Sequence, residues 1–215
     1  VPVCWGKNKS KAWLGLGYLE MGNVSSSGAA ALGARLAAMH RISSGKFGWV
    51  RDNTIGATPQ INSYFPSWIQ FWREQRYQLQ LARVNGYTGK LQTQGEQLLV
   101  QLDFFFPGAE PVASLLHGDL WSGNYSFDHA GQPVLFDPAI YYGDRETDIA
   151  MTELFGGFPA AFYAAYREAY PLDSGYSTRK TLYNLYHILN HLNLFGGGYL
   201  RQAEQMTSRL LAEIH

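Results

Sequence analysis

The chain has 215 residues, and its 17 basic and 17 acidic side chains leave a formal net charge of zero; 46% of the residues are hydrophobic. This composition indicates a folded globular protein. The absence of long basic runs argues against nucleic acid or a membrane surface as a partner. No apolar stretch approaches the roughly 18 residues of a membrane span, no signal peptide is visible, and the single cysteine, Cys4, excludes an intrachain disulfide. We therefore expect a cytoplasmic protein.

The N-terminal segment predicts two short strands and then a helix. Val1–Trp5 and Ala12–Leu19 are largely apolar and are separated by the polar turn Gly6–Lys11, which is typical of a strand pair. Ser25 offers N-cap chemistry, and a helix is expected from about Ser27 to His40, because leucines recur there at helical spacing.

The rest of the chain predicts mostly helices. Residues 41–66 are rich in Gly, Pro and Asn and predict a long ordered loop, and loops of that length are often functional. Helices are expected at Ser67–Val84, Leu91–Phe105, Thr147–Leu154, Ala160–Ala169, Thr178–Leu194 and Tyr199–Ile214. The expected buried face of the first of these carries Trp68, Phe71, Trp72, Gln75 and Leu79. Between the helices expected at Leu91–Phe105 and Thr147–Leu154, the sequence predicts a strand at Ser114–Leu116 and a hairpin of Tyr125–Phe127 with Pro133–Phe136.

The predicted loop after the strand at 114–116 is the most informative part of the chain. It reads His117-Gly118-Asp119-Leu120-Trp121-Ser122-Gly123-Asn124, and Asp137 ends the apolar run that follows. This spacing of Asp, Asn and Asp matches the one with which kinases hold an attacking hydroxyl and the metal on the nucleotide phosphates. Asp119 is the expected catalytic base, and Asn124 and Asp137 are the expected ligands of Mg²⁺. Taken singly these residues are ordinary turn formers, but their combination between apolar strands favours the kinase hypothesis.

Three further residues are candidates for supporting or substrate-binding roles. Trp121, an indole inside the loop, either packs in the core or stacks on a sugar or amine substrate. Tyr141 belongs to a Tyr-Tyr-Gly run that could line a substrate cleft. Asp148 is either a helix N-cap or a buried carboxylate that accepts backbone N–H groups of the loop and stiffens it. Both readings of Asp148 are structural.

For two other pairs of residues, a structural role is favoured over a functional one. His187 and His191 lie four residues apart on one predicted helix face, but a zinc site needs a third ligand and a nearby acid, so ordinary helix histidines are expected. Arg73 and Arg76, three residues apart, are expected to lie on a solvated face rather than to form an anion site.

At these residues the chain resembles the fructosamine kinase (ketosamine-3-kinase) family, within the aminoglycoside-phosphotransferase-like kinases. Gly118, where protein kinases carry Arg, is similar to the small-molecule branch. The similar segments are Leu116–Asn124, Phe136–Ala139, Tyr141–Met151, Leu154–Phe158, Asp52–Gly56, Phe71–Arg76 and Leu182–Leu192. The resemblance covers nearly the whole chain.

The resemblance implies a protein-kinase-like fold and, for the full-length protein, ATP-dependent phosphorylation of a sugar hydroxyl on a ketosamine, a step associated with deglycation repair. The substrate would be a small-molecule ketosamine or a glycated protein. Asp119 takes the position of the catalytic base, Asn124 and Asp137 take the metal positions, and Tyr18, Leu19, Glu20 and Met21 fall at the hinge that binds ATP. The fold class is then α+β: residues 22–215 form the mainly helical C-terminal lobe, and residues 1–21 are a remnant of the N-terminal lobe and hinge.

The resemblance also shows a departure. Members of the family carry a Gly-rich phosphate loop, a strand lysine and a helix glutamate in the N-terminal lobe, and this chain has only the last two strands of that lobe before Met21. The chain therefore reads as cut from a longer one, and we expect the isolated chain to be inactive. The exposed strand edges predict self-association.

Two alternatives to a ketosamine kinase stay open at this point. One is a kinase for another alcohol, such as an aminoglycoside or a choline-like compound. The other is an inactive, truncated kinase-like lobe that acts as a binding module.

Overall fold

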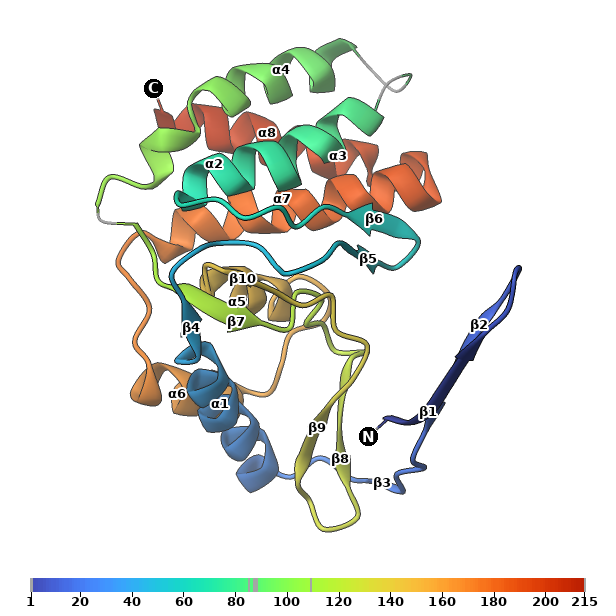
Figure 1. The fold of residues 1–215 in the computed structure, drawn as a ribbon. Coiled ribbons are helices and arrows are strands. Elements are labelled where there is room, and N and C mark those ends of the chain that lie inside the picture. The colour runs from blue at the N-terminus through green and yellow to red at the C-terminus, as the bar shows by residue number, and fades with distance from the viewer. Residues whose placement is uncertain (1, 85, 87–88, 109, 215) are drawn as a thin grey trace.

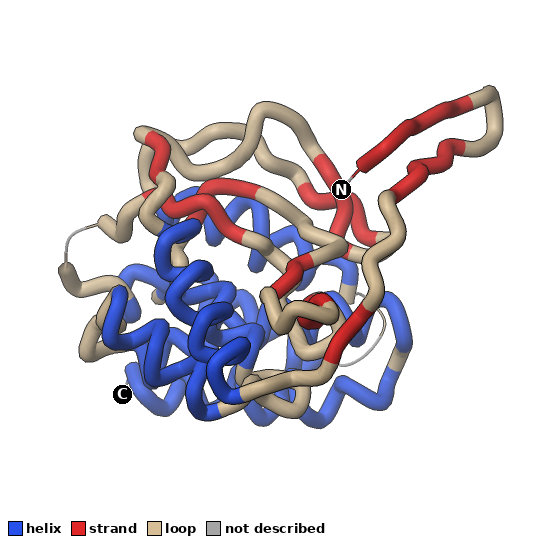
Figure 2. Tube along the Cα trace, turned by 90° about the horizontal axis from the view of Figure 1, so that it is seen from below, coloured by secondary structure: helices blue, strands red, loops and turns tan. Residues whose placement is uncertain are grey.

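A computed structural model describes residues 2–84, 86, 89–108 and 110–214 of the chain. Its first two strands, β1 (Pro2–Lys7) and β2 (Ala12–Leu16), form an antiparallel hairpin. This hairpin projects from the body of the molecule as an arm (Figures 1 and 2). The predicted strand pair is confirmed, although Val1 lies outside the described residues and β2 ends at Leu16 rather than Leu19.

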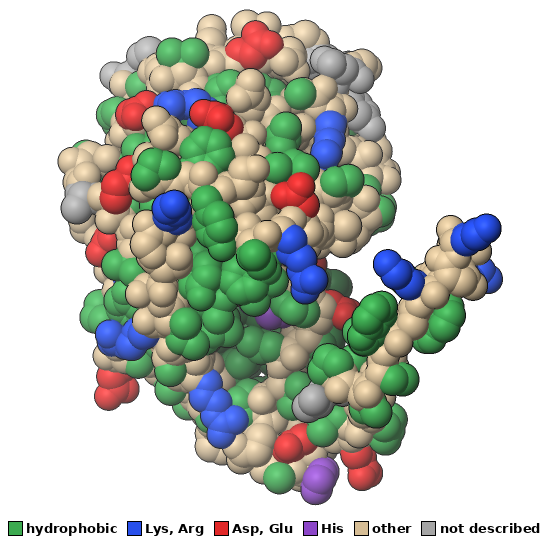
Figure 3. All heavy atoms as spheres, viewed as in Figure 1, with side chains coloured by type: hydrophobic (Ala, Val, Ile, Leu, Met, Phe, Trp, Pro, Cys, Tyr) green, Lys and Arg blue, Asp and Glu red, His purple; other side chains and the backbone are tan. Residues whose placement is uncertain are grey.

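Apolar side chains of the arm lie open to solvent. Val3 is 71% exposed, Trp5 74%, Trp13 55% and Leu16 58%. Figure 3 shows hydrophobic side chains along the arm and a hollow between the arm and the body. Among the described strands, β1 and β2 pair only with each other, so both outer edges of the hairpin are free.

The chain then enters the body through helix α1 (Ser26–His40). The Ser25 hydroxyl accepts a hydrogen bond from the backbone N–H of Gly28 and caps the helix, as predicted. One face of α1 packs against α6 (Ala160–Ala169), where Gly33 comes so close that an added Cβ would meet the carbonyl oxygen of Phe162.

A group of helices forms the opposite side of the body (Figure 1). It contains α2 (Trp68–Trp72), α3 (Gln78–Arg83), α4 (Gly89–Val100), α7 (Tyr176–Phe195) and α8 (Leu200–Ile214). The short α5 (Glu146–Thr152) packs on α7, and 3₁₀ turns occupy Leu102–Phe105 and Gly197–Tyr199. None of the helices in the described part of the chain has both the length and the apolarity needed to cross a bilayer.

The predicted helix Ser67–Val84 is interrupted by one π-helical segment, Arg73–Tyr77, between α2 and α3. A π turn holds an extra residue, so the buried stripe moves by one position beyond Trp72. Arg76 and Gln80 are buried where the sequence pattern pointed to Gln75 and Leu79. The prediction that Arg76 lies on a solvated face is therefore wrong, whereas Arg73 pairs with Asp103 at the surface.

Short strands connect these helices and carry the candidate site. Strand β7 (Ala113–Leu116) lies between β4 (Ser43–Ser44) and β10 (Tyr141–Gly143), and β8 (Tyr125–Asp128) lies between β9 (Pro133–Leu135) and β3 (Met21–Gly22). Strands β5 (Asn53–Ile55) and β6 (Thr58–Gln60) form a separate hairpin. Residues 41–66 are thus not the plain loop expected, because strands of two or three residues are too short to leave a periodic pattern.

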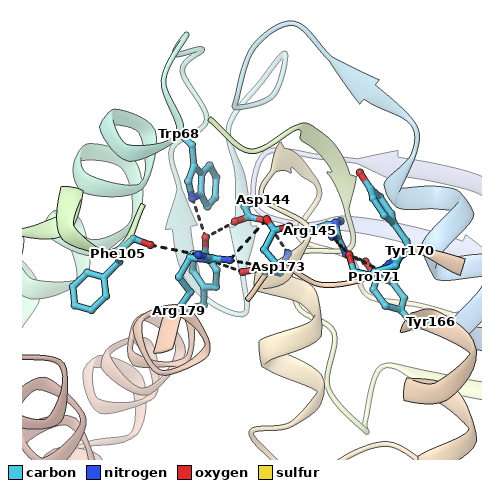
Figure 4. Close-up of polar contacts among 11 residues, drawn as sticks. Trp68, Phe105, Asp144, Arg145, Tyr166, Tyr170, Pro171, Asp173 and Arg179 are labelled. Carbon is cyan, nitrogen blue, oxygen red and sulfur yellow. Dashed lines mark hydrogen bonds and ion pairs between the residues drawn. The ribbon is translucent and has the colours of Figure 1, made fainter. Parts of the chain in front are cut away.

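Buried charges hold the start of α5 against α7 (Figure 4). The Arg179 guanidinium donates to both carboxylate oxygens of Glu146, at 2.7 and 3.0 Å. The Tyr183 hydroxyl donates to Asp144 and accepts from the Trp68 indole N–H. Burial, together with the neighbouring Glu146, raises the pKa of Asp144 to about 6. These contacts fix the turn from which the chain enters α5 and so set the position of Asp148.

Candidate active site

The loop from His117 to Asn124 leaves strand β7 and enters β8. Its turn depends on Gly118, which has a φ of +82°. An added Cβ at Gly118 would also meet the carbonyl oxygen of Ala139. In addition, the backbone N–H of Ala139 donates to the carbonyl oxygen of His117 at 2.8 Å. The loop and the segment that follows Asp137 are therefore in direct backbone contact, which only glycine permits at position 118.

The carboxylate of Asp148 binds the backbone of this loop through two hydrogen bonds. Its Oδ2 accepts from the backbone N–H of His117 at 2.7 Å, and its Oδ1 accepts from that of Gly118 at 2.9 Å. The side chain is 1% exposed. Burial alone would raise the pKa of Asp148, but the hydrogen bond and attraction to His40 and the hydrogen bond from the Gly118 N–H hold it below the ordinary value. The prediction of a buried carboxylate that stiffens the loop is confirmed.

His40 is a contact of Asp148 that the sequence did not reveal. Its Nε2 lies 3.1 Å from Oδ2 of Asp148, and its Nδ1 lies 2.7 Å from the hydroxyl of Tyr166 on α6. The sequence marks His40 only as the last residue of a helix, and nothing in its spacing points to Asp148, which is 108 residues away.

His117 braces the loop rather than facing a substrate. Its Nε2 lies 2.9 Å from the carbonyl oxygen of Phe136, and its Nδ1 lies 3.3 Å from the backbone N–H of Asp119. A carbonyl only accepts and an N–H only donates, so the ring is neutral with its proton on Nε2. Burial lowers the pKa of His117, in agreement with this assignment.

Asp119 sits partly buried within the loop. The Nδ2 of Asn124 donates to its carbonyl oxygen at 2.8 Å and contacts its carboxylate Oδ2 at 3.3 Å. Burial raises the pKa of Asp119 from 3.8 to about 6; the Asn124 contact opposes the shift, and the negative charges of Asp148 and Asp137 add to it. A carboxylate with such a pKa is poised to accept a proton near neutral pH.

Asn124 and Asp137 offer oxygen atoms that suit a hard divalent cation. The Asn124 amide nitrogen is held by Asp119, so its Oδ1 is left as an acceptor. Asp137 is exposed at the end of the β8–β9 hairpin, and no hydrogen bond or ion pair joins its carboxylate to another described residue. The described residues contain no cluster of three His, Cys, Asp or Glu side chains that could hold a metal ion. A cation here would need Asn124, Asp137 and phosphate oxygens together, which is the donor set that Mg²⁺ prefers.

Trp121 is the aromatic residue of the loop that reaches solvent. It is 38% exposed, and its ring contacts Phe155 edge to face at 6.4 Å. An added Cβ at Gly123 would meet the indole, so Gly123 leaves the space in which the ring lies. Part of the indole is therefore open to solvent, two residues after Asp119 in the same loop.

Tyr141 does not lie on a cleft wall. It is 3% exposed, its ring stacks on Phe71, and the Arg76 guanidinium lies 4.1 Å from the ring centre. The predicted contact between Tyr141 and substrate finds no support in this geometry, because the ring is buried in the core beneath the site.

The predicted hinge lies between the arm and the body. Tyr18 is 93% exposed, and Leu19 and Glu20 are in irregular backbone. Met21 begins β3 and pairs with Asp128 at the end of β8. The predicted domain boundary at residues 21 and 22 thus falls inside a strand that is attached to the β8–β9 hairpin.

A cavity lies on another part of the body. It has a volume of about 870 Å³ and is lined by segments 104–108, 110–112, 144–146, 170–171, 173–175 and 178–179 with Glu213. Its lining includes none of Asp119, Asn124 and Asp137, so it is separate from the loop that carries Asp119. Among the described residues, His187 and His191 belong to no group of three possible metal ligands. Burial lowers the pKa of His187 to about 3, and the His191 Nδ1 lies 2.8 Å from the carbonyl oxygen of His187.

Comparison with known proteins gives one consistent family. The family model described as fructosamine kinase matches residues 1–213. A probable ketoamine kinase from Synechocystis is 47% identical over 211 residues, covering 98% of this chain and 71% of that protein.

Solved structures agree with this similarity. A Thermobifida fusca protein, provisionally named a fructosamine-3-kinase, has a TM-score of 0.87 at 31% identity, covering 99% of this chain and 74% of that one. An amicoumacin kinase in complex with AMP-PNP, Ca²⁺ and its substrate has a TM-score of 0.58 at 14% identity, covering 99% of this chain and 71% of that one. The latter similarity shows that the two proteins share a fold.

Proposed function

The chain belongs to the fructosamine kinase family, and on this basis we propose that it phosphorylates a sugar hydroxyl of a ketosamine with Asp119 as the catalytic base. The observation that carries the proposal is the geometry of Asp119. It is partly buried beside Asn124, in a loop whose backbone is held by Asp148, and its pKa is raised to about 6.

In this proposal each residue of the loop has a distinct task. Asp119 accepts the proton of the attacking hydroxyl, or orients that hydroxyl. His117 stays neutral and keeps Asp119 in place through its contact with the Asp119 N–H. Asp148 keeps the loop backbone rigid, so that Asp119 does not move when substrate binds.

ATP and Mg²⁺ are the proposed cofactors. Asn124 and Asp137 would hold the metal, which would neutralise charge on the transferred phosphoryl group. The structural relative that shares the fold was solved with AMP-PNP and Ca²⁺, which supports a nucleotide and a divalent cation here. Backbone groups of Tyr18, Leu19, Glu20 and Met21 are the proposed contacts of the adenine.

Trp121 is the proposed substrate contact. The exposed part of its indole lies in the same loop as Asp119, and aromatic faces stack well on the apolar faces of sugars and on amines. The acceptor would be the sugar part of a free ketosamine or of a glycated protein side chain. We also propose that the protein acts in the cytoplasm.

The test uses the protein together with any residues that naturally precede Val1, because the chain by itself is expected to be inactive. The purified protein is incubated with ATP, Mg²⁺ and a panel of acceptors that includes a fructosamine, an aminoglycoside and choline. Phosphate transfer to the fructosamine, lost on Asp119→Asn, is the expected result. Phosphate transfer to the aminoglycoside or to choline, and not to the fructosamine, would show that the acceptor is not a ketosamine. Wild-type rates in Asp119→Asn would remove Asp119 from the mechanism.

We propose, in addition, that the arm mediates self-association. Its apolar side chains are more than half exposed and its strand edges are free, which favours pairing with a second chain. Sedimentation of the protein at increasing concentration should show dimers, and Trp5→Lys should reduce them. A monomer at all concentrations would contradict this part of the proposal.

A further inference from the structure

Four polar side chains that have no part in the proposed mechanism are joined by hydrogen bonds in a continuous series, which is called the relay. We infer that Arg76, Asn62, Asn53 and Gln60 position the segment that carries Asp137 and are therefore positioning residues for metal binding. The inference rests on the proposed role of Asp137. It is carried by a continuous series of hydrogen bonds that runs from Arg76 through Asn62 and Asn53, together with Gln60, to the carbonyl oxygens of Ala139 and Ile140.

The relay begins at a buried cation. Arg76 is 0% exposed, lies in the π-helical segment, and has no ion-pair partner among the described residues. Its guanidinium donates to the carbonyl oxygen of Ile61 at 2.7 Å and to Oδ1 of Asn62 at 2.8 Å, and it lies over the ring of Tyr141. Burying an arginine without a carboxylate partner lowers the stability of the folded state. The fold keeps this donor in place in spite of that loss.

Arginine only donates hydrogen bonds, and this fixes the orientation of the next amides. Because Oδ1 of Asn62 faces Arg76, its Nδ2 is directed to Oδ1 of Asn53, at 2.9 Å. Gln60 donates to the same oxygen at 2.8 Å. With two donors on Oδ1, the Nδ2 of Asn53 is turned to the carbonyl oxygen of Ile140, at 2.8 Å.

Gln60 closes the relay on the neighbouring residue. Its Nε2 also donates to the carbonyl oxygen of Ala139 at 3.0 Å, and its Oε1 accepts from the Tyr186 hydroxyl at 3.3 Å. The side chain is 2% exposed, so no solvent would replace these bonds. The carbonyl oxygens of Ala139 and Ile140 therefore accept hydrogen bonds from the side-chain amides of Gln60 and Asn53. The orientation of these amides follows from the donor of Arg76.

The held segment lies directly beside the site. Ala139 is two residues after Asp137 and donates its N–H to His117, and its carbonyl packs against Gly118. Asp137 itself has a φ of +52°, which is unusual for a residue other than glycine. Such a conformation persists only when its surroundings hold it, and the relay supplies that support on the C-terminal side.

A purely structural role for the β5–β6 hairpin is the competing explanation. The hairpin is also tied to α7, because the Thr58 hydroxyl donates to Oδ1 of Asn190 at 2.6 Å. Thr58 lies in the same strand as Gln60 and is similarly buried, but its described side-chain hydrogen bond goes to Asn190 and not to residues 137–140. Thr58→Val is therefore a matched control, which loosens the same hairpin without touching the relay.

The experiment compares Gln60→Met and Thr58→Val by two measurements. The first is hydrogen exchange of the Ala139 amide in the protein without metal. The second is the affinity for Mn²⁺ in the presence of AMP-PNP, followed by electron paramagnetic resonance. We expect Gln60→Met to speed the exchange at least tenfold and to weaken Mn²⁺ binding about tenfold or more, as outer-shell changes at metal sites typically do. Thr58→Val should change neither by more than about twofold.

Unchanged exchange at Ala139 in Gln60→Met, or an equal change in Thr58→Val, would overturn the inference. If Gln60→Met does not fold, Asn53→Ala replaces it, because Asn53 is less buried and holds Ile140 in the same way. Asp137→Asn serves as the reference: if Mn²⁺ binds equally well to it, the proposed metal site fails, while the exchange at Ala139 still tests the relay.

Discussion

The carboxylate of Asp148 accepts a hydrogen bond from the backbone N–H of Gly118 at 2.9 Å, although the two residues are 30 positions apart. The second carboxylate oxygen accepts from His117. Both bonds are buried, so the loop from His117 to Asn124 is held by a charge that solvent does not screen. This relationship explains how a loop rich in turn formers is kept in one conformation.

Asp148→Asn is expected to lower the free energy of unfolding by about 3 kcal/mol, because the amide accepts less well and brings an unwanted donor toward buried N–H groups. Chemical denaturation checks the value. Asp128→Asn is the control, since Asp128 also accepts two backbone N–H groups, but in the exposed turn of the β8–β9 hairpin. Equal losses in the two variants would contradict a special role of Asp148.

The stabilising contribution of Asp148 should also depend on pH. Its pKa is held below the ordinary value in the folded protein, so the unfolded chain takes up this proton first on acidification. The contribution is present above the unfolded pKa of about 4 and is lost as the pH falls further. Unfolding free energies measured between pH 3 and 6 should show the loss in the wild type and a smaller one in Asp148→Asn.

Asp119→Asn should lower kcat roughly 100- to 10,000-fold, the usual contribution of a general base. In the wild type, kcat/KM should rise with pH through about 6, because Asp119 must be ionised to accept a proton and its pKa is raised to about 6. A pH profile of the free enzyme measures this limb. An acid limb near pH 4 would show that Asp119 titrates as an ordinary carboxyl.

The same substitution should stabilise the protein at neutral pH. Because the folded-state pKa of Asp119 lies above the unfolded value, stability from this carboxyl is greatest below pH 4 and is lost as the pH rises through about 6. Removing the charge should restore about 1–2 kcal/mol at pH 7, allowing for partial solvation of the group. A gain that persists unchanged at pH 4 would point to another cause.

Gly118→Ala should destabilise the protein by more than about 2 kcal/mol, because the φ of +82° disfavours alanine and the new Cβ would meet the carbonyl oxygen of Ala139. Gly131→Ala is the matched control. Gly131 has a φ of +75° but nothing near its Cβ position, so it should lose only about 1 kcal/mol. Thermal unfolding of both variants separates the clash from the backbone term.

Trp121→Ala should raise the KM for the ketosamine roughly 2- to 10-fold with little change in unfolding free energy, since aromatic contacts contribute about 0.5–1.5 kcal/mol and the indole is already 38% exposed. Trp13→Ala, at an exposed tryptophan of the arm, is the control for loss of an indole. A KM that does not move would remove Trp121 from the substrate site.

Local chemistry along the sequence was enough for the main elements and for the loop. Helix caps, apolar periodicity and the spacing of Asp119, Asn124 and Asp137 depend on residues close together in the chain. For the same reason the helix at 26–40 and the β8–β9 hairpin were predicted nearly to the residue. The role of Asp148 was predicted only as one of two readings, because its partners are 30 and 31 residues away.

Tertiary structure alone decided what lies beneath the site. The π-helical segment turned Arg76 into the core, where the sequence pattern placed it in solvent, since one extra residue in a turn leaves no mark on composition. Tyr141 is buried in the folded protein, so its geometry gives no support for a contact with substrate. Gln60 and Asn53 donate hydrogen bonds to the backbone that follows Asp137. The sequence by itself therefore determined which residues could carry the chemistry, because that depends on residue type and short spacing. Only the packed fold determined which residues hold them in place, because hydrogen bonds between distant segments exist only after the chain has folded.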